Sequence, residues 1–334
     1  MEKNPIILPE LPAIDGLTLH TSKEGEVGDI SLSSLEGIPG SEEIRAAFTE
    51  GEVAQQRKGW LVAERNHQIM SAAVIESWHE EDGRWVYQIR GWVLPEWRGR
   101  GFGSAMLHWG ENESRNLAAV EHAGERFEYG GRANSTDSDS ILLLLNAGYS
   151  FGYTDLEMEL DPAAPLTDSP LPPGVELRPA LSEHVPLIAE SIAEAYRNEF
   201  PDHRFHHTHS EAAGQAAWYS NPVHDRSLWQ VAWDPASGTV VGQVLPILNN
   251  QHGYIDEVSV RPAWRRNGLA RALLTRALVR LRSLGATVIR LNTTNEFRTR
   301  ARDLYTSLGF RVVKTVLYYR KSPGAFDSDS ISPS

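Results

Sequence analysis

Two short segments place arginine beside glycine or alanine directly before a run of helix-forming residues. The first is RGRGFG, residues 98–103, and the second is RRNGLA, residues 265–270. The first turn of a helix leaves backbone N–H groups unpaired at the positive end of the helix dipole, which suits an anion. Small residues let a phosphate approach, and arginine adds positive charge. The pattern predicts two sites for a pyrophosphate group.

Two other phosphate-binding loops are excluded by their own patterns. The sequence contains no G-x-x-x-x-G-K-[ST] segment, so it has no P-loop. GRGFG lacks the third glycine of a dinucleotide-binding fingerprint, and hairpin-like strands surround it instead of alternating strands and helices.

The two segments belong to an internal repeat. In register with them stand the identical pairs Val93/Val260, Pro95/Pro262, Trp97/Trp264, Arg98/Arg265 and Gly101/Gly268. Further along, LLLNAGY (143–149) parallels LYTSLGF (304–310). A repeat of this length predicts duplication of one α+β unit, not a solenoid.

Composition limits the class of protein. The chain has 334 residues, 41% of them hydrophobic, with no cysteine and a net charge of −12. The lack of cysteine excludes disulfides, Cys-ligated zinc and a cysteine nucleophile, and the charge argues against nucleic-acid binding. Because no long apolar run or leader is evident, we expect no membrane span and a cytoplasmic location.

The proline distribution predicts the domain boundary. Residues 161–174 carry five prolines among small and polar residues, which is typical of a linker. We therefore expect an N-terminal domain at 1–160 and a C-terminal domain at 175–321, followed by a disordered tail at 322–334.

Hydrophobic periodicity predicts the elements of the second copy. Residues 175–179, 228–233, 239–248 and 253–260 read as strands, and the apolar stripe from Ala270 to Leu281 predicts a helix packed on a sheet. A further strand (287–293), a helix (298–308) and a last strand or pair of strands (310–321) complete the copy. The fold class expected is α+β.

The loop motif [RQ]-x-x-G-x-[GA], present twice, and the closing motif LYTSLGF resemble those of the GCN5-related N-acetyltransferase (GNAT) family. The resemblance covers residues from about 15 to 321 and implies two tandem domains. Each would have a central, mostly antiparallel, splayed β-sheet flanked by helices. The tandem arrangement is similar to the mycothiol synthase type of double-GNAT protein.

The resemblance implies acetyl-coenzyme A as co-substrate, lying where the strand that ends at Val260 splays from the strand at 288–292. Its pantetheine arm would bond the backbone of Val258 and Val260, and its pyrophosphate would rest on the N–H groups of 266–271. The implied binding residues are Val258, Val260, Arg265, Arg266, Asn267, Gly268, Leu269, Ala270, Arg271 and Asn295, with Val93, Arg98, Gly99, Arg100, Gly101, Phe102 and Gly103 in the first copy. Asn295 precedes Tyr305 by ten residues, a longer spacing than the family pattern.

The resemblance also implies direct attack of an amine on the thioester. Tyr305 matches the tyrosine that protonates the leaving thiolate, and Asp256 and Glu257 are the candidates for the base. Strand alternation sends their side chains to opposite faces unless a bulge intervenes. We prefer Glu257, with a water chain as the alternative.

The first copy departs from the pattern at these positions. Leu144 stands opposite Tyr305, and Ile89 and Arg90 stand opposite Asp256 and Glu257. We therefore expect catalysis in the C-terminal domain, while the N-terminal domain binds coenzyme A weakly or only supports its neighbour.

The acceptor is expected to be a primary amine of a small molecule. Tyr196, Phe200, Trp218 and Tyr219 would form an aromatic wall, while His203, His206, His207 and His209 are read as polar lining or surface rather than as a metal site. No metal, nucleic acid or membrane is expected as partner, and the protein would be a monomer or homodimer. Two alternatives stay open: a non-catalytic acetyl-coenzyme A-binding regulator, and a transferase for a longer acyl group.

Overall fold

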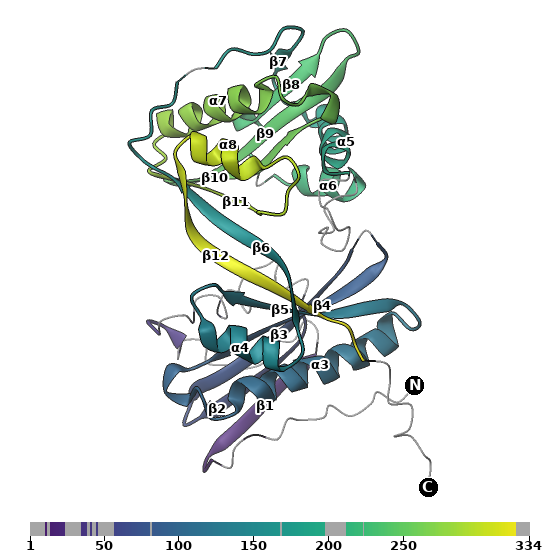
Figure 1. Ribbon diagram of the computed structural model, residues 1–334, viewed down its shortest axis with the longest axis vertical. Coiled ribbons are helices and arrows are strands. Elements are labelled where there is room, and N and C mark those ends of the chain that lie inside the picture. Colours follow the sequence, from purple (N-terminus) through teal and green to yellow (C-terminus); the bar gives the residue numbers. More distant parts are fainter. Residues whose placement is uncertain are drawn as a thin grey trace. The chain divides into compact units, whose positions relative to one another are not determined.

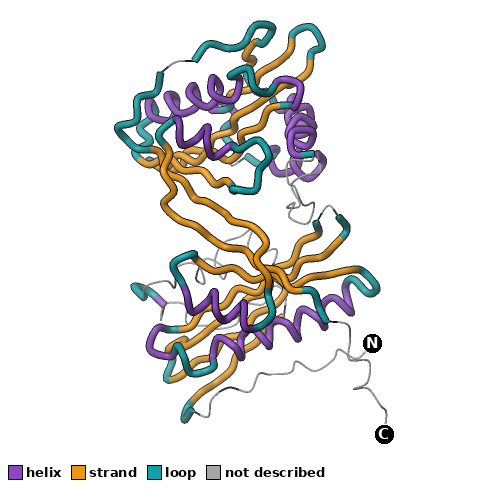
Figure 2. Tube along the Cα trace, viewed as in Figure 1, coloured by secondary structure: helices purple, strands orange, loops and turns teal. Residues whose placement is uncertain are grey.

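The computed structural model describes residues 11, 14–23, 35–38, 41, 45, 57–80, 82–167, 169–197, 212–222 and 224–324. The chain divides into two compact units (Figures 1 and 2). Unit 1 comprises Met1–Gly152 and Tyr318–Ser334, and unit 2 comprises Tyr153–Leu317. Each is a mixed α+β unit, as predicted.

Unit 1 is a sheet with helices packed on it. Its strands are β1 (Leu17–Lys23), β2 (Arg57–Arg65), β3 (Gln68–His79), β4 (Arg84–Val93) and β5 (Arg126–Asn134), and its helices are η2 (Pro95–Trp97), α3 (Phe102–Glu121) and α4 (Ser138–Asn146). Strands β1 to β4 pair antiparallel, and β4 pairs parallel with β5. Helix α3 buries Phe102, Met106 and Trp109 against the sheet, in one core cluster with Leu61 and Ile75.

Unit 2 repeats this plan. Its strands are β7 (Glu176–Arg178), β8 (Gln230–Asp234), β9 (Thr239–Asn249), β10 (His252–Val260) and β11 (Val288–Thr293), and its helices are η3 (Ser182–His184), α5 (Val185–Tyr196), α6 (Ala212–Tyr219), η6 (Arg226–Leu228), η7 (Pro262–Trp264), α7 (Leu269–Ser283) and α8 (Ala301–Ser307). The apolar stripe of α7 packs on one face of the sheet, and α5 packs on the other. Strand β10 pairs antiparallel with β9 and parallel with β11. The predicted mostly antiparallel sheet is confirmed.

Two long strands serve both units. Strand β6 (Ser150–Leu160) begins in unit 1, and from Leu156 to Glu159 it pairs antiparallel with β11 of unit 2. Strand β12 (Phe310–Lys321) begins in unit 2 and ends in unit 1, where it follows β5 in the strand order. The units therefore divide within β6 and within β12, whereas the predicted linker 161–174 lies inside unit 2.

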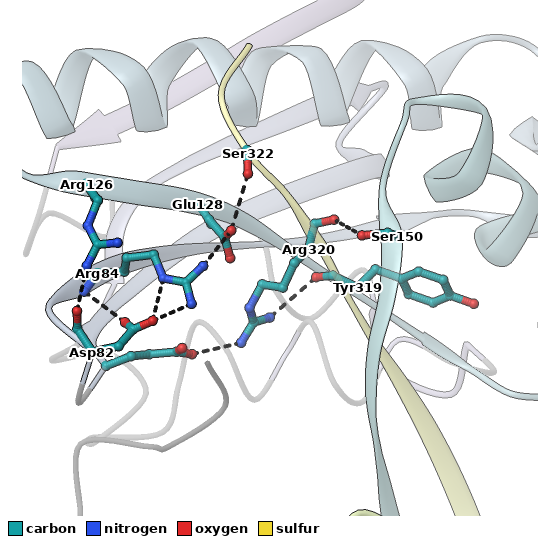
Figure 3. A network of polar contacts seen from close by, with 9 residues as sticks. Asp82, Arg84, Arg126, Glu128, Ser150, Tyr319, Arg320 and Ser322 are labelled. Atoms are coloured by element: carbon teal, nitrogen blue, oxygen red, sulfur yellow. Dashed lines mark hydrogen bonds and ion pairs between the residues drawn. The ribbon is translucent and has the colours of Figure 1, made fainter. Parts of the chain in front are cut away.

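Buried ion pairs hold the end of β12 in unit 1. Arg320 Nη2 lies 3.1 Å from Glu80 Oε1, and Lys321 Nζ lies 2.8 Å from both carboxylate oxygens of Glu111. Glu80 and Glu111 are buried. Burial raises the pKa of Glu80 to about 7 against the opposing effect of Arg320. Figure 3 shows Arg320 and Tyr319 beside a second polar group, in which Arg84 contacts Asp82 and Glu128.

Candidate functional site

A β-bulge in strand β10 brings the two candidate bases to one face of the sheet. The register with β9 shifts between Ile255 and Glu257, which leaves Asp256 as the extra residue. Ile255 faces the core beneath α7, so Asp256 faces the opposite side, and the bulge turns Glu257 to that side as well. The carboxylates of Asp256 and Glu257 accordingly both contact aromatic residues of α5 and α6.

Glu257 lies in a buried polar cluster. The Tyr196 hydroxyl, at the end of α5, donates a hydrogen bond to Glu257 Oε1 at 3.2 Å. Ser259, two residues along the same face, bonds Glu257 and accepts from the side chain of Gln243 on β9. Burial raises the pKa of Glu257 to about 8, with the charge of Asp256 raising it further and the Ser259 and Tyr196 hydroxyls opposing the shift. A carboxyl with this pKa accepts a proton near neutral pH.

Asp256 has a different environment. It is half-buried, and the indole Nε1 of Trp218 lies 3.5 Å from its Oδ2. Tyr219 is the next residue of α6. Burial raises its pKa, and the charges of the nearby Glu257 and Asp256 raise it further. Asp256 forms no ion pair with any residue that the structure describes.

Tyr305 lies on the short helix α8 near Glu257. Its ring is buried and packs edge-on against Phe310, with 6.1 Å between centroids. Burial raises the pKa of its hydroxyl, and the negative charge of Glu257 adds to the shift. The hydroxyl therefore stays protonated, and within the described part of the chain it has no hydrogen-bond acceptor. A protonated hydroxyl therefore lies within the electrostatic influence of a carboxyl of raised pKa.

The two arginine-glycine loops have the same backbone conformation. A 3₁₀ turn at Pro95–Trp97 or Pro262–Trp264 leads into each. Gly99 and Arg266 hold φ of 71° and 65°, and Gly101 and Gly268 both hold 90° as helix N-caps. Arg266 is not a glycine, so its left-handed conformation costs about 1 to 2 kcal/mol. Both loops keep this conformation, which is strained only at Arg266 because Gly99 has no Cβ.

Both helices begin without a cap from the N-cap residue. Neither Gly101 nor Gly268 provides a side-chain hydrogen bond, and the Leu269 N–H donates only a long hydrogen bond, 3.4 Å, to Asn267 Oδ1. No atom lies within 4 Å of the position that a Cβ would take at Gly268. Unpaired N–H groups below open space suit the approach of a phosphate, so the residues present fit a pyrophosphate.

The arginines of the second loop hold elements together. Arg265 Nε donates to the Val260 carbonyl at 3.0 Å, and its Nη2 donates to the Ala195 carbonyl, beside Tyr196. Arg271 donates to the Ser307 hydroxyl and so links α7 to α8, the helix that carries Tyr305. In the first loop, Arg98 Nε donates to the Val93 carbonyl at 3.2 Å in the same way. Arg266 is exposed at the loop surface.

Both sheets splay beside these loops. Pairing of β10 with β11 ends at Ile255 and Leu291, although β10 continues to Val260. Pairing of β4 with β5 ends at Gln88 and Gly130, although β4 continues to Val93. The predicted splay is confirmed, and it leaves the backbone of residues 256–260 without partners from β11.

The first copy has the splay but lacks the bulge and the reactive groups. Strand β4 pairs with β3 in unbroken register from Trp85 to Val93. Ile89 is buried against Gly110 of α3, and Arg90 Nη1 bonds Glu76 Oε1 at 2.7 Å. Leu144 packs over Gly131. Apolar packing and an internal ion pair occupy the positions that Asp256, Glu257 and Tyr305 hold in the second copy.

The remaining predicted site residues that the structure describes form no hydrogen bond or ion pair with Glu257 or Tyr305. Asn295 is exposed in the loop before α8 and accepts a hydrogen bond from Arg302 at 2.9 Å. Arg100 of the first loop stacks over the Trp97 ring at 4.7 Å. Phe200 and His203, His206, His207 and His209 lie outside the described residues. Among described residues, no group of three or more His, Asp or Glu could hold a metal ion, and no helix is long and apolar enough to span a membrane.

Comparison with protein families identifies the class. The model of the acetyltransferase (GNAT) family matches residues 30–125 and 188–310, which together cover more than half of the chain. The chain belongs to this family of acyltransferases, and the two matches make it a tandem member. A search of curated proteins gave no match.

Solved structures share the tandem fold. A GCN5-related N-acetyltransferase from Sphaerobacter thermophilus matches with a TM-score of 0.72 and 20% identity, over 95% of this chain and 98% of that one. A tandem GNAT protein from the clavulanic acid biosynthesis pathway matches with a TM-score of 0.63 and 12% identity, over 93% of this chain and 100% of that one. An acetyltransferase of the family from Colwellia psychrerythraea matches with a TM-score of 0.54 and 13% identity, over 91% of this chain and 100% of that one. At these identities the likeness extends to the fold alone.

Proposed function

We propose that this protein is an N-acetyltransferase that transfers the acetyl group of acetyl-coenzyme A to a primary amine of a small molecule, with catalysis in unit 2. The observation that carries the proposal is the raised pKa of Glu257 and of Tyr305, the second raised in part by the charge of the first, with Glu257 on the part of β10 that splays from β11. The family membership supports acyl transfer in general.

Acetyl-coenzyme A would be held by the loop at 265–271 and by the backbone of Val258 and Val260, which has no partner on β11, and it would supply an acyl group activated as a thioester. Gly268 leaves the space for its pyrophosphate, and the N–H groups of Ala270 and Arg271 point out of the uncapped end of α7. Asn295 is assigned to the edge of this site.

The residues of unit 2 would then move two protons. Glu257, once ionised, takes a proton from the amine nitrogen as that nitrogen attacks the acyl carbon. Tyr305 donates its hydroxyl proton to the departing sulfur, so the products are an amide and a thiol. Removal of Glu257 or Tyr305 should therefore lower kcat more than it weakens binding.

Unit 1 is proposed to play a supporting role. Its loop has the same backbone as the catalytic one, so weak binding of coenzyme A there stays a hypothesis. Its strand β4 carries Arg90, bound to Glu76, where a base would be needed. The likeness to the mycothiol synthase type and the cytoplasmic location likewise stay hypotheses.

The proposal is tested by following thiol release from acetyl-coenzyme A in the presence of a panel of primary amines, with mass spectrometry of the products. Amine-dependent release and an acetylated product are expected. Tight binding of acetyl-coenzyme A without turnover across the whole panel would favour the regulatory alternative. Turnover with longer acyl-coenzyme A but not with acetyl-coenzyme A would favour the other alternative.

A further inference from the structure

Asp256, on the acceptor side of unit 2, has no counter-ion among the residues that the structure describes. Asp256 is half-buried between the sheet and α6, and it contacts the Trp218 indole and Tyr219 but forms no ion pair with any described residue. A partly desolvated carboxylate is stabilised by a cation, so this position suits a positively charged group of a ligand.

Aromatic rings lie beside the carboxylates of Asp256 and Glu257. Trp218 and Tyr219 belong to α6, and Tyr196 from α5 packs against Phe297 with ring centroids 5.9 Å apart. Faces of tryptophan and tyrosine attract ammonium groups, and they also provide apolar contact for the carbon atoms of a ligand. A carboxylate beside such rings selects an ammonium over a neutral or negative group.

The same face of the sheet continues to be acidic beyond Asp256. On β6, Asp155, Glu157 and Glu159 alternate with core residues and so lie on the face that carries Tyr254 and Asn292. Tyr254 donates to Asn292 at 3.1 Å, and Asn292 donates to Asp155 at 2.8 Å. After burial, the charges of Asp256, Asp155 and Glu157 raise the pKa of Tyr254, so the potential there is negative.

Arg290, an arginine of this face, is already engaged in ion pairs. Arg290 of β11 contacts Glu157 at 2.8 Å and Glu159 at 2.8 Å. Arg290 could pair with a carboxylate or phosphate of a ligand only by losing these two ion pairs. An acceptor that carries an anionic group beside its amine would meet repulsion from Asp256 and Glu157.

We infer that the acceptor is an amine that is cationic and carries no carboxylate or phosphate, and that Asp256 selects it by binding its ammonium group. The inference rests on the proposed function and deepens it. Asp256 and Glu257 then have separate tasks. Asp256 determines which amine binds as its ammonium ion; the nitrogen attacks after this ion has lost one proton to water, and Glu257 takes the second proton during the attack.

Matched amine pairs test the inference with the full-length protein. Tyramine is compared with tyrosine, and 1,5-diaminopentane with lysine, at saturating acetyl-coenzyme A. For each pair we expect kcat/KM of the carboxylate-free amine to be at least tenfold higher. The Asp256→Asn variant should raise KM for that amine about tenfold, change kcat less than threefold and reduce the discrimination. Glu190→Gln, an exposed carboxylate change on α5, is the matched control and should leave both values unchanged.

The outcomes separate the inference from the proposed function. Equal or better turnover of tyrosine and lysine by the wild-type protein overturns the inference and leaves the acetyltransferase proposal in place. Binding of acetyl-coenzyme A without acetylation of any amine overturns both. A loss of kcat at unchanged KM in Asp256→Asn would assign Asp256 to the chemical step instead. If this variant does not fold, the comparison of amine pairs with the wild-type protein still decides.

Discussion

Asp256 and Glu257 are neighbours in the chain, yet their side chains lie on the same face of strand β10. A bulge between Ile255 and Glu257 is the cause, because it adds one residue to β10 without a partner on β9. In the first copy the strand runs without a bulge, and Ile89 and Arg90 alternate between faces. One extra residue in β10 thus places two carboxylates on one face in the second copy, whereas the matching residues of the first copy lie on opposite faces of β4.

The pH dependence of turnover should report the ionisation of Glu257. Its pKa is raised to about 8 by burial, so the base is mostly protonated at pH 6 and mostly ionised above pH 8. We expect kcat to rise with pH, to reach half of its maximum near pH 8 and to level off about one pH unit above that. In Glu257→Gln, kcat should fall about 100-fold or more, and the rise of kcat with pH should disappear. If the variant keeps this rise, the ionisation belongs to another group.

The two phosphate loops offer a matched pair of substitutions. Gly268 and Gly101 both have φ of 90°, which costs alanine about 1 to 2 kcal/mol. Gly268→Ala should raise KM for acetyl-coenzyme A about tenfold, because its strain distorts the loop of the reacting unit. Gly101→Ala should destabilise unit 1 similarly yet change KM less than twofold. The reverse result would place turnover in unit 1.

The last strand should be essential to unit 1. A chain that ends at Leu317 lacks Arg320 and Lys321 and leaves Glu80 and Glu111 buried without their cations. Breaking a buried pair costs about 3 to 5 kcal/mol, and a whole domain is stable by only about 5 to 15 kcal/mol. We expect this chain to lose one cooperative transition in calorimetry, whereas a chain ending at Gly324 keeps both. A normal transition for unit 1 in the shorter chain would contradict this role of β12.

Local sequence patterns predicted the features that depend on local chemistry. The glycines and arginines of 98–103 and 265–270 predicted two like turns before helices, and the stripe from Ala270 to Leu281 predicted α7. The α+β class followed from the internal repeat and the hydrophobic periodicity, and the splay followed from the resemblance of these motifs to a family. These features are encoded within a few residues of one another, so a single sequence is enough to recognise them.

Other features depend on partners distant in the chain. The residue pattern of strands β6 and β12 does not depend on which sheet they join. The sequence therefore did not show that each strand runs through both units. No glycine marks the bulge at Asp256, and Arg266 adopts a left-handed conformation that its type disfavours. The bonds from Tyr196 to Glu257 and from Gln243 to Ser259 join residues 61 and 16 positions apart.

Turnover by Tyr305→Phe is the sharpest test of catalysis in unit 2, because this variant removes one buried hydroxyl and little else. We expect kcat to fall about 100-fold or more, with the Kd for acetyl-coenzyme A changed less than twofold. Tyr87→Phe, which removes a buried hydroxyl in unit 1, should keep full activity. Undiminished turnover by Tyr305→Phe would contradict the claim that unit 2 carries out the reaction with Tyr305 as its acid.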